Sequence, residues 1–133
     1  MIVADFRDLI GTDRDVKDPD GQWTSLRQFL AKDGLGYSFH KTTIEPNAVL
    51  HMEYKNHVEL VSIIQGEGEI TDEKTGKIYP LKPGVTYLLN DNDAHILRAG
   101  ADGLVAHCIF TPAVTGDEVH GEDGAYPAPP SEG

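Results

Sequence analysis

From Tyr37 onward the sequence is a series of short segments, rich in β-branched and aromatic residues, that are divided by Gly, Pro, Asn and Asp. The segments are YSFHKTTI (37–44), HVELVSIIQ (57–65), GEIT (68–71), KIYPL (77–81), TYLL (86–89), HILRA (95–99) and LVAHCIF (104–110). Many short strands with turn residues between them are typical of a small antiparallel barrel or sandwich. The pattern therefore predicts an all-β fold for most of the chain.

The N-terminal part is more mixed, and one stretch of it favours a helix. WTSLRQFLAKDG, residues 23–34, has apolar residues at helical spacing, Thr24 or Ser25 as a possible cap, and Gly34 just past its end. The preceding GTDRDVKDPDGQ is expected to be a polar loop because Asp, Pro and Gly crowd together there. We therefore expect one short N-terminal helix beside the β-structure.

The length and charge of the chain restrict its organisation and its partners. A chain of 133 residues with 39% hydrophobic residues is expected to form one domain with a real core. We place this domain at residues 1–127 and expect residues 128–133, in a Pro- and Gly-rich tail, to be disordered. Because 22 Asp and Glu outnumber 11 Lys and Arg, the net charge is −11, which disfavours nucleic acid and anionic lipid as partners. A small molecule is the expected partner.

The N-terminus and the cysteine content favour the cytoplasm. MIVADFRDLI has no long apolar run behind a basic start, so we expect no signal peptide and no membrane span. Cys108 is the single cysteine, so no intramolecular disulfide can form.

One carboxylate is expected inside the barrel. Alternate residues of a strand point to the same face, so His57 and Glu59 share a side with Val61 and Ile63. An isolated buried carboxylate is costly, and a divalent cation or a cationic substrate would offset that cost. Glu59 is therefore a candidate for binding either a divalent cation or a cationic substrate.

Two stretches resemble the metal-binding motifs of the cupin barrels. In the first, Glu59 is followed by six residues and then Gly66, but Met52 and Tyr54 stand where the usual pair of histidines would be. In the second, which begins at Gly84, the histidine is kept as His95. The Pro and the second Gly of this motif are replaced by Asn90 and Asn92.

A carboxylate and an imidazole suit iron, zinc or manganese, but they are too few for a site. The polar residue of suitable type on a neighbouring strand is Tyr87, in PGVTYLLN. The alternative interpretation is that Tyr87 is a packed aromatic and Glu59 a hydrogen-bonded strand residue. The spacing alone leaves both interpretations open.

Four longer stretches resemble the ectoine synthase family in order and spacing. They are DGLGYSFHKTTI, YKNHVELVSIIQGEGEI, PLKPGVTYLLNDNDAH and TGDEVHGEDGAYP, and the resemblance extends over residues 1 to about 127. It implies a cupin barrel, usually a homodimer, with a catalytic iron, Fe(II) being the expected form. The implied reaction is a hydro-lyase reaction that closes N-γ-acetyl-L-2,4-diaminobutyrate into the cyclic compatible solute ectoine.

The resemblance also implies roles for individual residues. The metal ligands fall on Glu59, Tyr87 and His95. Proton transfer is assigned to Tyr54, His57 and Glu118. Substrate contacts fall on Trp23, Arg27, Thr42, Phe110 and His120. Within this set the planar guanidinium of Arg27 suits the substrate carboxylate, and the rings of Trp23 and Phe110 would exclude water.

The segment TGDEVHGEDGAYP, residues 115–127, follows the last expected strand and contains enough Gly to bend over the barrel mouth. We therefore expect it to act as a cover that excludes water during the reaction.

Three other functions fit the same residues less fully. They are a cupin that binds a small molecule without turnover, an iron cupin that activates oxygen, and a relative that cyclises a neighbouring amino acid. The missing histidine pair disfavours oxygen activation, because such enzymes typically hold iron with several imidazoles.

Overall fold

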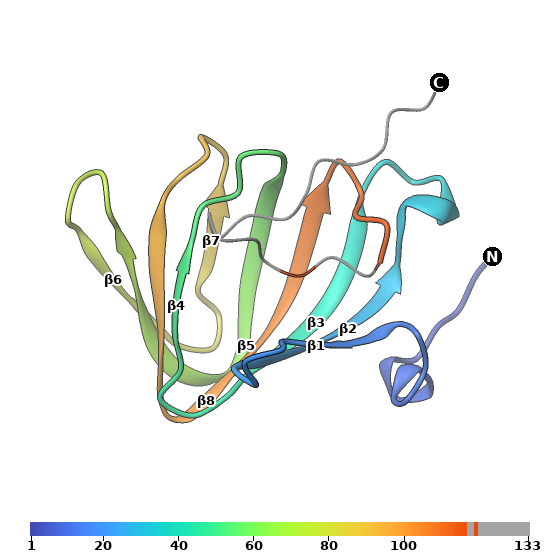
Figure 1. Ribbon diagram of the computed structural model, residues 1–133, viewed down its shortest axis with the longest axis horizontal. Helices are drawn as coiled ribbons and strands as arrows, with labels where there is room; N and C mark the ends of the chain where they lie inside the picture. The colour runs from blue at the N-terminus through green and yellow to red at the C-terminus, as the bar shows by residue number, and fades with distance from the viewer. Residues whose placement is uncertain (117–118, 120–133) are drawn as a thin grey trace.

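The computed structural model describes residues 1–116 and residue 119, and antiparallel β-sheet dominates this part of the chain (Figure 1). The strands are β1 (Asp15–Lys17), β2 (Trp23–Phe29), β3 (Ser38–Ile44), β4 (Val49–Met52), β5 (Val58–Asp72), β6 (Ile78–Leu81), β7 (Thr86–Leu89) and β8 (His95–Thr111). Two short 3-10 helices, η1 (Phe6–Leu9) and η2 (Ala31–Asp33), accompany them. The all-β fold expected from the sequence is confirmed.

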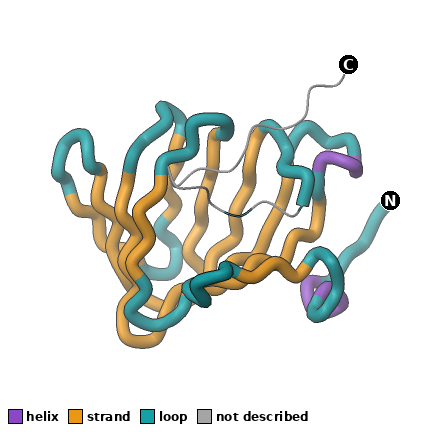
Figure 2. The backbone as a smooth tube through the Cα atoms, in the orientation of Figure 1, coloured by secondary structure: helices purple, strands orange, loops and turns teal. Residues whose placement is uncertain are grey.

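The strands form one curved sheet in the order β1-β2-β3-β8-β5-β6, to which β4 adds by pairing with β8 and β7 by pairing with β5. The two long strands produce the curvature, because each changes partners along its length. Residues 104–110 of β8 pair with β3, whereas residues 95–98 pair with β4. Figure 2 shows the result, a barrel-like wall with loops gathered at its two ends.

The pairing of β5 with β8 is irregular in its middle. The register shifts between Ile63 and Gln65 and again between Gly66 and Gly68. Bulges of this kind bend a strand and increase its twist, which lets a sheet curl into a barrel. The sequence segments 57–65 and 68–71 are therefore parts of one bent strand, and so are 95–99 and 104–110.

The helix expected from Thr24 or Ser25 to Gly34 is wrong. Residues 23–29 form β2, which lies between β1 and β3 and bonds to both. Burial alternates along β2, with Trp23, Ser25 and Arg27 fully buried and the residues between them half-buried. Pairing on both edges satisfies the backbone of this segment, and it overrides the weak helical spacing. Only η2 is helical there, and it does end at Gly34, in the left-handed conformation.

The antiparallel register places inward-facing side chains of four strands in rows across the barrel wall. One row crosses Arg27 on β2, His40 on β3, Cys108 on β8 and Val61 on β5. All four side chains are buried. The interior of the barrel therefore carries polar and ionisable groups as well as apolar ones, and these rows position the candidate site.

The bend in β5 gives a first testable prediction. Gly66 has φ +87°, and a Cβ there would meet the carbonyl oxygen of Gly103 at 2.1 Å. We expect Gly66→Ala to lower the free energy of unfolding by about 3 kcal/mol or more, because the backbone of two strands must separate. Gly76 has φ +73° with open space around it, so Gly76→Ala should cost only about 1 kcal/mol. Urea unfolding of both variants measures the difference, and equal costs would show that close approach at Gly66 is unimportant.

Candidate active site

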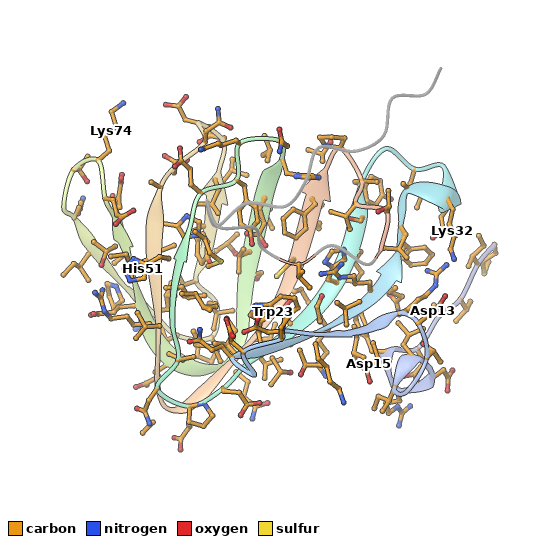
Figure 3. The ribbon with its side chains drawn as sticks, in the orientation of Figure 1. Asp13, Asp15, Trp23, Lys32, His51 and Lys74 are labelled. Atoms are coloured by element: carbon orange, nitrogen blue, oxygen red, sulfur yellow. The ribbon has the colours of Figure 1, made fainter. Side chains whose placement is uncertain are left out.

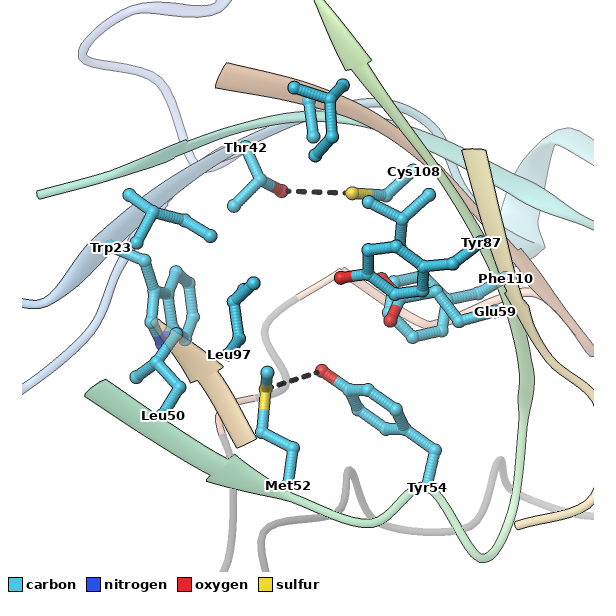
Figure 4. Close-up of a pocket in the computed structure, with 14 residues that line it drawn as sticks. Trp23, Thr42, Leu50, Met52, Tyr54, Glu59, Tyr87, Leu97, Cys108 and Phe110 are labelled. Atoms are coloured by element: carbon cyan, nitrogen blue, oxygen red, sulfur yellow. Dashed lines mark hydrogen bonds between the residues drawn. The ribbon is translucent and has the colours of Figure 1, made fainter. Parts of the chain in front are cut away.

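A cavity in the barrel collects most of the residues that the sequence singled out. Side chains of β2, β3, β5, β7 and β8 and of the segment around β4 surround it (Figure 4). Of the predicted site residues, it is lined by Trp23, Thr42, Tyr54, Glu59, Tyr87 and Phe110. Figure 3 shows the side chains against the whole ribbon, with Trp23 inside the barrel.

Two of the three predicted metal ligands lie close together in this cavity. Tyr87 is paired with Val61, two residues along β5 from Glu59. The pKa of Tyr87 is raised well above its ordinary value by burial first, and then by the nearby charge of Glu59. The carboxylate and the phenolic oxygen therefore belong to one local site, as Figure 4 also shows.

The third predicted ligand, His95, lies at the start of β8 and lines a neighbouring cavity that Tyr87 also borders. Its Nδ1 lies 2.8 Å from the backbone oxygen of Asp93. This contact fixes the tautomer with Nδ1–H donating, so Nε2 carries the lone pair. Nε2 is buried and has no hydrogen-bond partner among the described residues. His95 is thus prepared as an acceptor or ligand, and Tyr87 borders both its cavity and the cavity of Glu59.

These observations fit a metal ion. Burial raises the pKa of Glu59 to about 8, so the carboxylate lacks the compensation that a cation would give. Tyr87 and His95 supply the oxygen and nitrogen donors beside it. No cluster of three His, Cys, Asp or Glu side chains occurs in the described part of the chain, so the set depends on the phenolic oxygen of Tyr87.

The raised pKa of Glu59 predicts a pH dependence for the metal-free protein. Between its ordinary value of 4.5 and about 8, the folded carboxyl keeps its proton whereas the unfolded one loses it. This contribution to stability is therefore complete below pH 4.5 and is lost as the pH rises through 8. The free energies of unfolding of wild type and Glu59→Gln should be similar at low pH. As the pH rises, the variant should become the more stable of the two. A constant difference would contradict the prediction.

The predicted carboxylate-binding residue, Arg27, is fully buried on β2. Its Nε donates to Ser25 Oγ at 3.3 Å, and its Cζ lies 6.0 Å from the centre of the Trp23 ring. A guanidinium stays charged when it is buried, so this end of the barrel favours an anionic group.

Phe110 is the centre of an aromatic group in the barrel. Its ring meets Tyr54 edge-on at 5.3 Å and His57 edge-on at 5.7 Å between ring centres. Tyr54 also directs its hydroxyl to Met52 Sδ at 3.5 Å, and its ring lies 6.1 Å from that of His95. Phe110 thus packs against two of the three predicted proton-transfer residues, Tyr54 and His57, beside the cavity.

Several predicted features lie outside the described residues: Glu118, His120 and the tail at 128–133 that was expected to be disordered. Of the expected cover, residues 115–127, only residues 115, 116 and 119 are described.

The sequence interpretation missed two buried residues that belong to the same interior. Cys108 lines the cavity, donates to Thr42 Oγ1 at 3.6 Å, and has a pKa raised by burial and by Glu59. His40 lies beside Phe110, with 5.2 Å between ring centres. The sequence signal was available. His40 lies two residues before Thr42, and Cys108 lies two residues before Phe110, so each shares one face of a strand with a predicted substrate contact.

The structure shows no membrane-spanning helix: none of its described helices has the length and apolarity that crossing a bilayer requires.

Fold and site together define a cupin-type barrel. The crystal structure of a cupin domain from a transcriptional regulator of Enterobacter cloacae matches with a TM-score of 0.58 at 17% identity, over 68% of this chain and 96% of that one. At this identity the match supports the fold alone.

The closer relatives are enzymes. An L-ectoine synthase of Hyphomonas neptunium is 57% identical over 129 residues, which cover 96% of this chain and 94% of that protein. The crystal structure of ectoine synthase from P. lautus matches with a TM-score of 0.84 at 40% identity, over 100% of this chain and 95% of that one. The family model described as ectoine synthase matches residues 1–130. The chain belongs to the ectoine synthase family.

Proposed function

We propose that the protein closes N-γ-acetyl-L-2,4-diaminobutyrate into ectoine with loss of one water. The observation that supports this most is that a buried carboxylate, Glu59, and the phenol of Tyr87 line one cavity together with Trp23, Thr42, Tyr54 and Phe110. Relatives named L-ectoine synthase, similar over nearly the full length, support the same reaction.

The reaction is difficult because an amide must act as the electrophile. The α-amine of the substrate attacks its own acetyl carbonyl carbon, and the carbonyl oxygen finally leaves as water. Folding the flexible substrate so that amine and carbonyl meet supplies part of the rate. Arg27 would hold the carboxylate at one end, while Trp23 and Phe110 enclose the reacting amide and keep water out.

The protons of this reaction are assigned to Tyr54, His57 and Glu118. The carbonyl oxygen needs two protons to leave as water. The attacking amine loses the first, which makes the hydroxyl, and one of the two nitrogens on the same carbon loses the second as the hydroxyl departs. His57 is buried beside Phe110 and shares the inward face of Glu59, so it is suited to one of these transfers. Thr42 and His120 complete the proposed substrate contacts.

Glu59, Tyr87 and His95 would hold the metal, which we propose to be iron as Fe(II). When bound, such a cation polarises the amide carbonyl oxygen as a Lewis acid. The same donor set suits zinc or manganese, so metal analysis of protein purified without chelators tests the choice.

We also propose a cytoplasmic homodimer. The single cysteine is buried and free, which fits a reducing compartment. Large apolar side chains on the outer face, such as Ile64 and Leu88, are 41% and 51% exposed, which fits a further subunit contact. Light scattering of the purified protein tests the assembly, and a monomeric mass would contradict it.

Mass spectrometry tests the reaction. The purified protein, loaded with iron, is incubated with the acetylated diamino acid while dissolved oxygen is followed. The proposal predicts a product lighter by one water and no oxygen uptake. Tight binding without turnover would instead indicate a binding protein, oxygen uptake would indicate an oxygenase, and turnover of only a neighbouring amino acid would indicate a relative with another substrate.

A further inference from the structure

His40 is a buried imidazole that the reaction as described does not use. It lies in the middle of β3, and its side chain is 1% exposed. Neither ring nitrogen has a hydrogen-bond partner among the described residues. A buried polar atom without a partner costs about 1–3 kcal/mol, so a native protein that keeps two of them in one side chain calls for an explanation.

The surroundings of His40 point to a ligand. The register pairs it with Arg27 on β2, and both residues face the barrel interior. Two residues along β3 on the same face, Thr42 lines the main cavity. The ring packs against Phe110, whose other neighbours are Tyr54 and His57. His40 therefore lies in the barrel interior beside Arg27, and it contacts Phe110, which lines the cavity.

The charge of His40 follows from these neighbours. Burial first, then the positive charge of Arg27 and the proximity of His57, lower its pKa well below the ordinary value of 6.5. A neutral imidazole has one N–H donor and one lone pair. It can support the binding of an anion by Arg27 without adding a second buried charge.

We propose that His40 is a substrate-binding residue, which donates one hydrogen bond to the same carboxylate that Arg27 binds. The inference rests on the proposed function, since it takes the α-carboxylate of that substrate as the anion. A charge and a neutral donor on adjacent strands bind the two carboxylate oxygens from one side. The site thereby selects amino acids with a free carboxylate, and the second ring nitrogen remains available to accept from water.

Three substitutions separate binding from packing. His40→Phe keeps an aromatic ring of similar size against Phe110 but removes both nitrogens. His40→Asn and His40→Gln each place an amide N–H at the distance of one ring nitrogen. Thr43→Asn, on the exposed face of the same strand, is the matched control.

Two ligands are compared with each protein by calorimetric binding and by KM: N-γ-acetyl-2,4-diaminobutyrate and its carboxamide analogue. For the carboxylate ligand we expect His40→Phe to weaken binding and raise KM about 10- to 100-fold, because a hydrogen bond to a charged group is lost. His40→Asn or His40→Gln should recover most of the affinity. The carboxamide oxygen accepts only a weaker, neutral hydrogen bond, so His40→Phe should weaken its binding by only about 2- to 5-fold.

Equal losses for both ligands, or no loss in His40→Phe, would overturn the inference and leave His40 as a packing residue. If wild type neither binds nor converts the acetylated diamino acid, the proposed function fails and this inference fails with it. If wild type converts it and His40→Phe retains its KM, only this inference fails.

A measurement on wild type covers the case in which His40→Phe does not fold. Nitrogen-15 NMR of the zinc-loaded protein should show the His40 ring N–H shifting when the carboxylate ligand is added, with a much smaller shift for the carboxamide. Identical shifts with both ligands would count against a contact with the carboxylate.

Discussion

Glu59→Ala, Tyr87→Ala and His95→Ala are each expected to lower bound iron and to reduce turnover by at least about 100-fold. Substitution of groups that only support a metal ligand typically costs 10- to 100-fold, and loss of a ligand itself should cost more. Tyr87→Phe is the sharpest variant, because it removes only the phenolic oxygen of a residue that borders both cavities. Plasma emission spectrometry measures the metal, and the rate of ectoine formation measures turnover.

Tyr79→Phe is the matched control, since Tyr79 borders the neighbouring cavity but is 43% exposed. It should keep both metal and activity. Full metal occupancy in Tyr87→Phe would remove the phenol from the coordination sphere and leave the third position to water or to another histidine.

His57→Ala is expected to keep its metal and to lose kcat by roughly 100- to 10,000-fold, which is the range for removal of a general acid or base. Substrate affinity should change far less, because the lost interaction is made in the transition state. The same expectation holds for Glu118→Ala. Steady-state kinetics and metal analysis of the same preparations separate the two effects.

The exposed His51 provides the control for His57, and His51→Ala should be kinetically silent. Loss of metal in His57→Ala would move His57 into the coordination sphere. A rise in KM with an unchanged kcat would make it a substrate contact.

The sequence was most informative where one face of a strand is buried and the other is not. Alternation in HVELVSIIQ predicted that Glu59 faces inward beside Val61, and both are buried in the structure. The segment of Trp23 and Arg27 was instead predicted as a helix from the helical spacing of its apolar residues. It is a strand with alternating burial. Pairing of that segment with β1 and β3 is a long-range effect, which local spacing does not encode.

Contacts between strands far apart in the chain were also beyond the sequence pattern. His40 and Arg27 are neighbours only because β2 and β3 pair in one particular register. The two halves of β5 were expected as separate segments, since Gly66 and Gly68 interrupt the apolar pattern, yet the bulges keep the strand continuous. Resemblance to a family predicted Tyr87 as a metal ligand, whereas spacing alone left a packed aromatic as an equal interpretation.

A substrate labelled with heavy oxygen at its acetyl carbonyl gives the most direct test of the central claim, that the protein removes this oxygen as water by closing the ring. The iron-loaded protein is incubated with this substrate, and mass spectrometry follows the label. The account predicts ectoine without label and the label recovered in water. Label recovered in free acetate would show that the protein hydrolyses the amide instead of cyclising it, and would contradict the account.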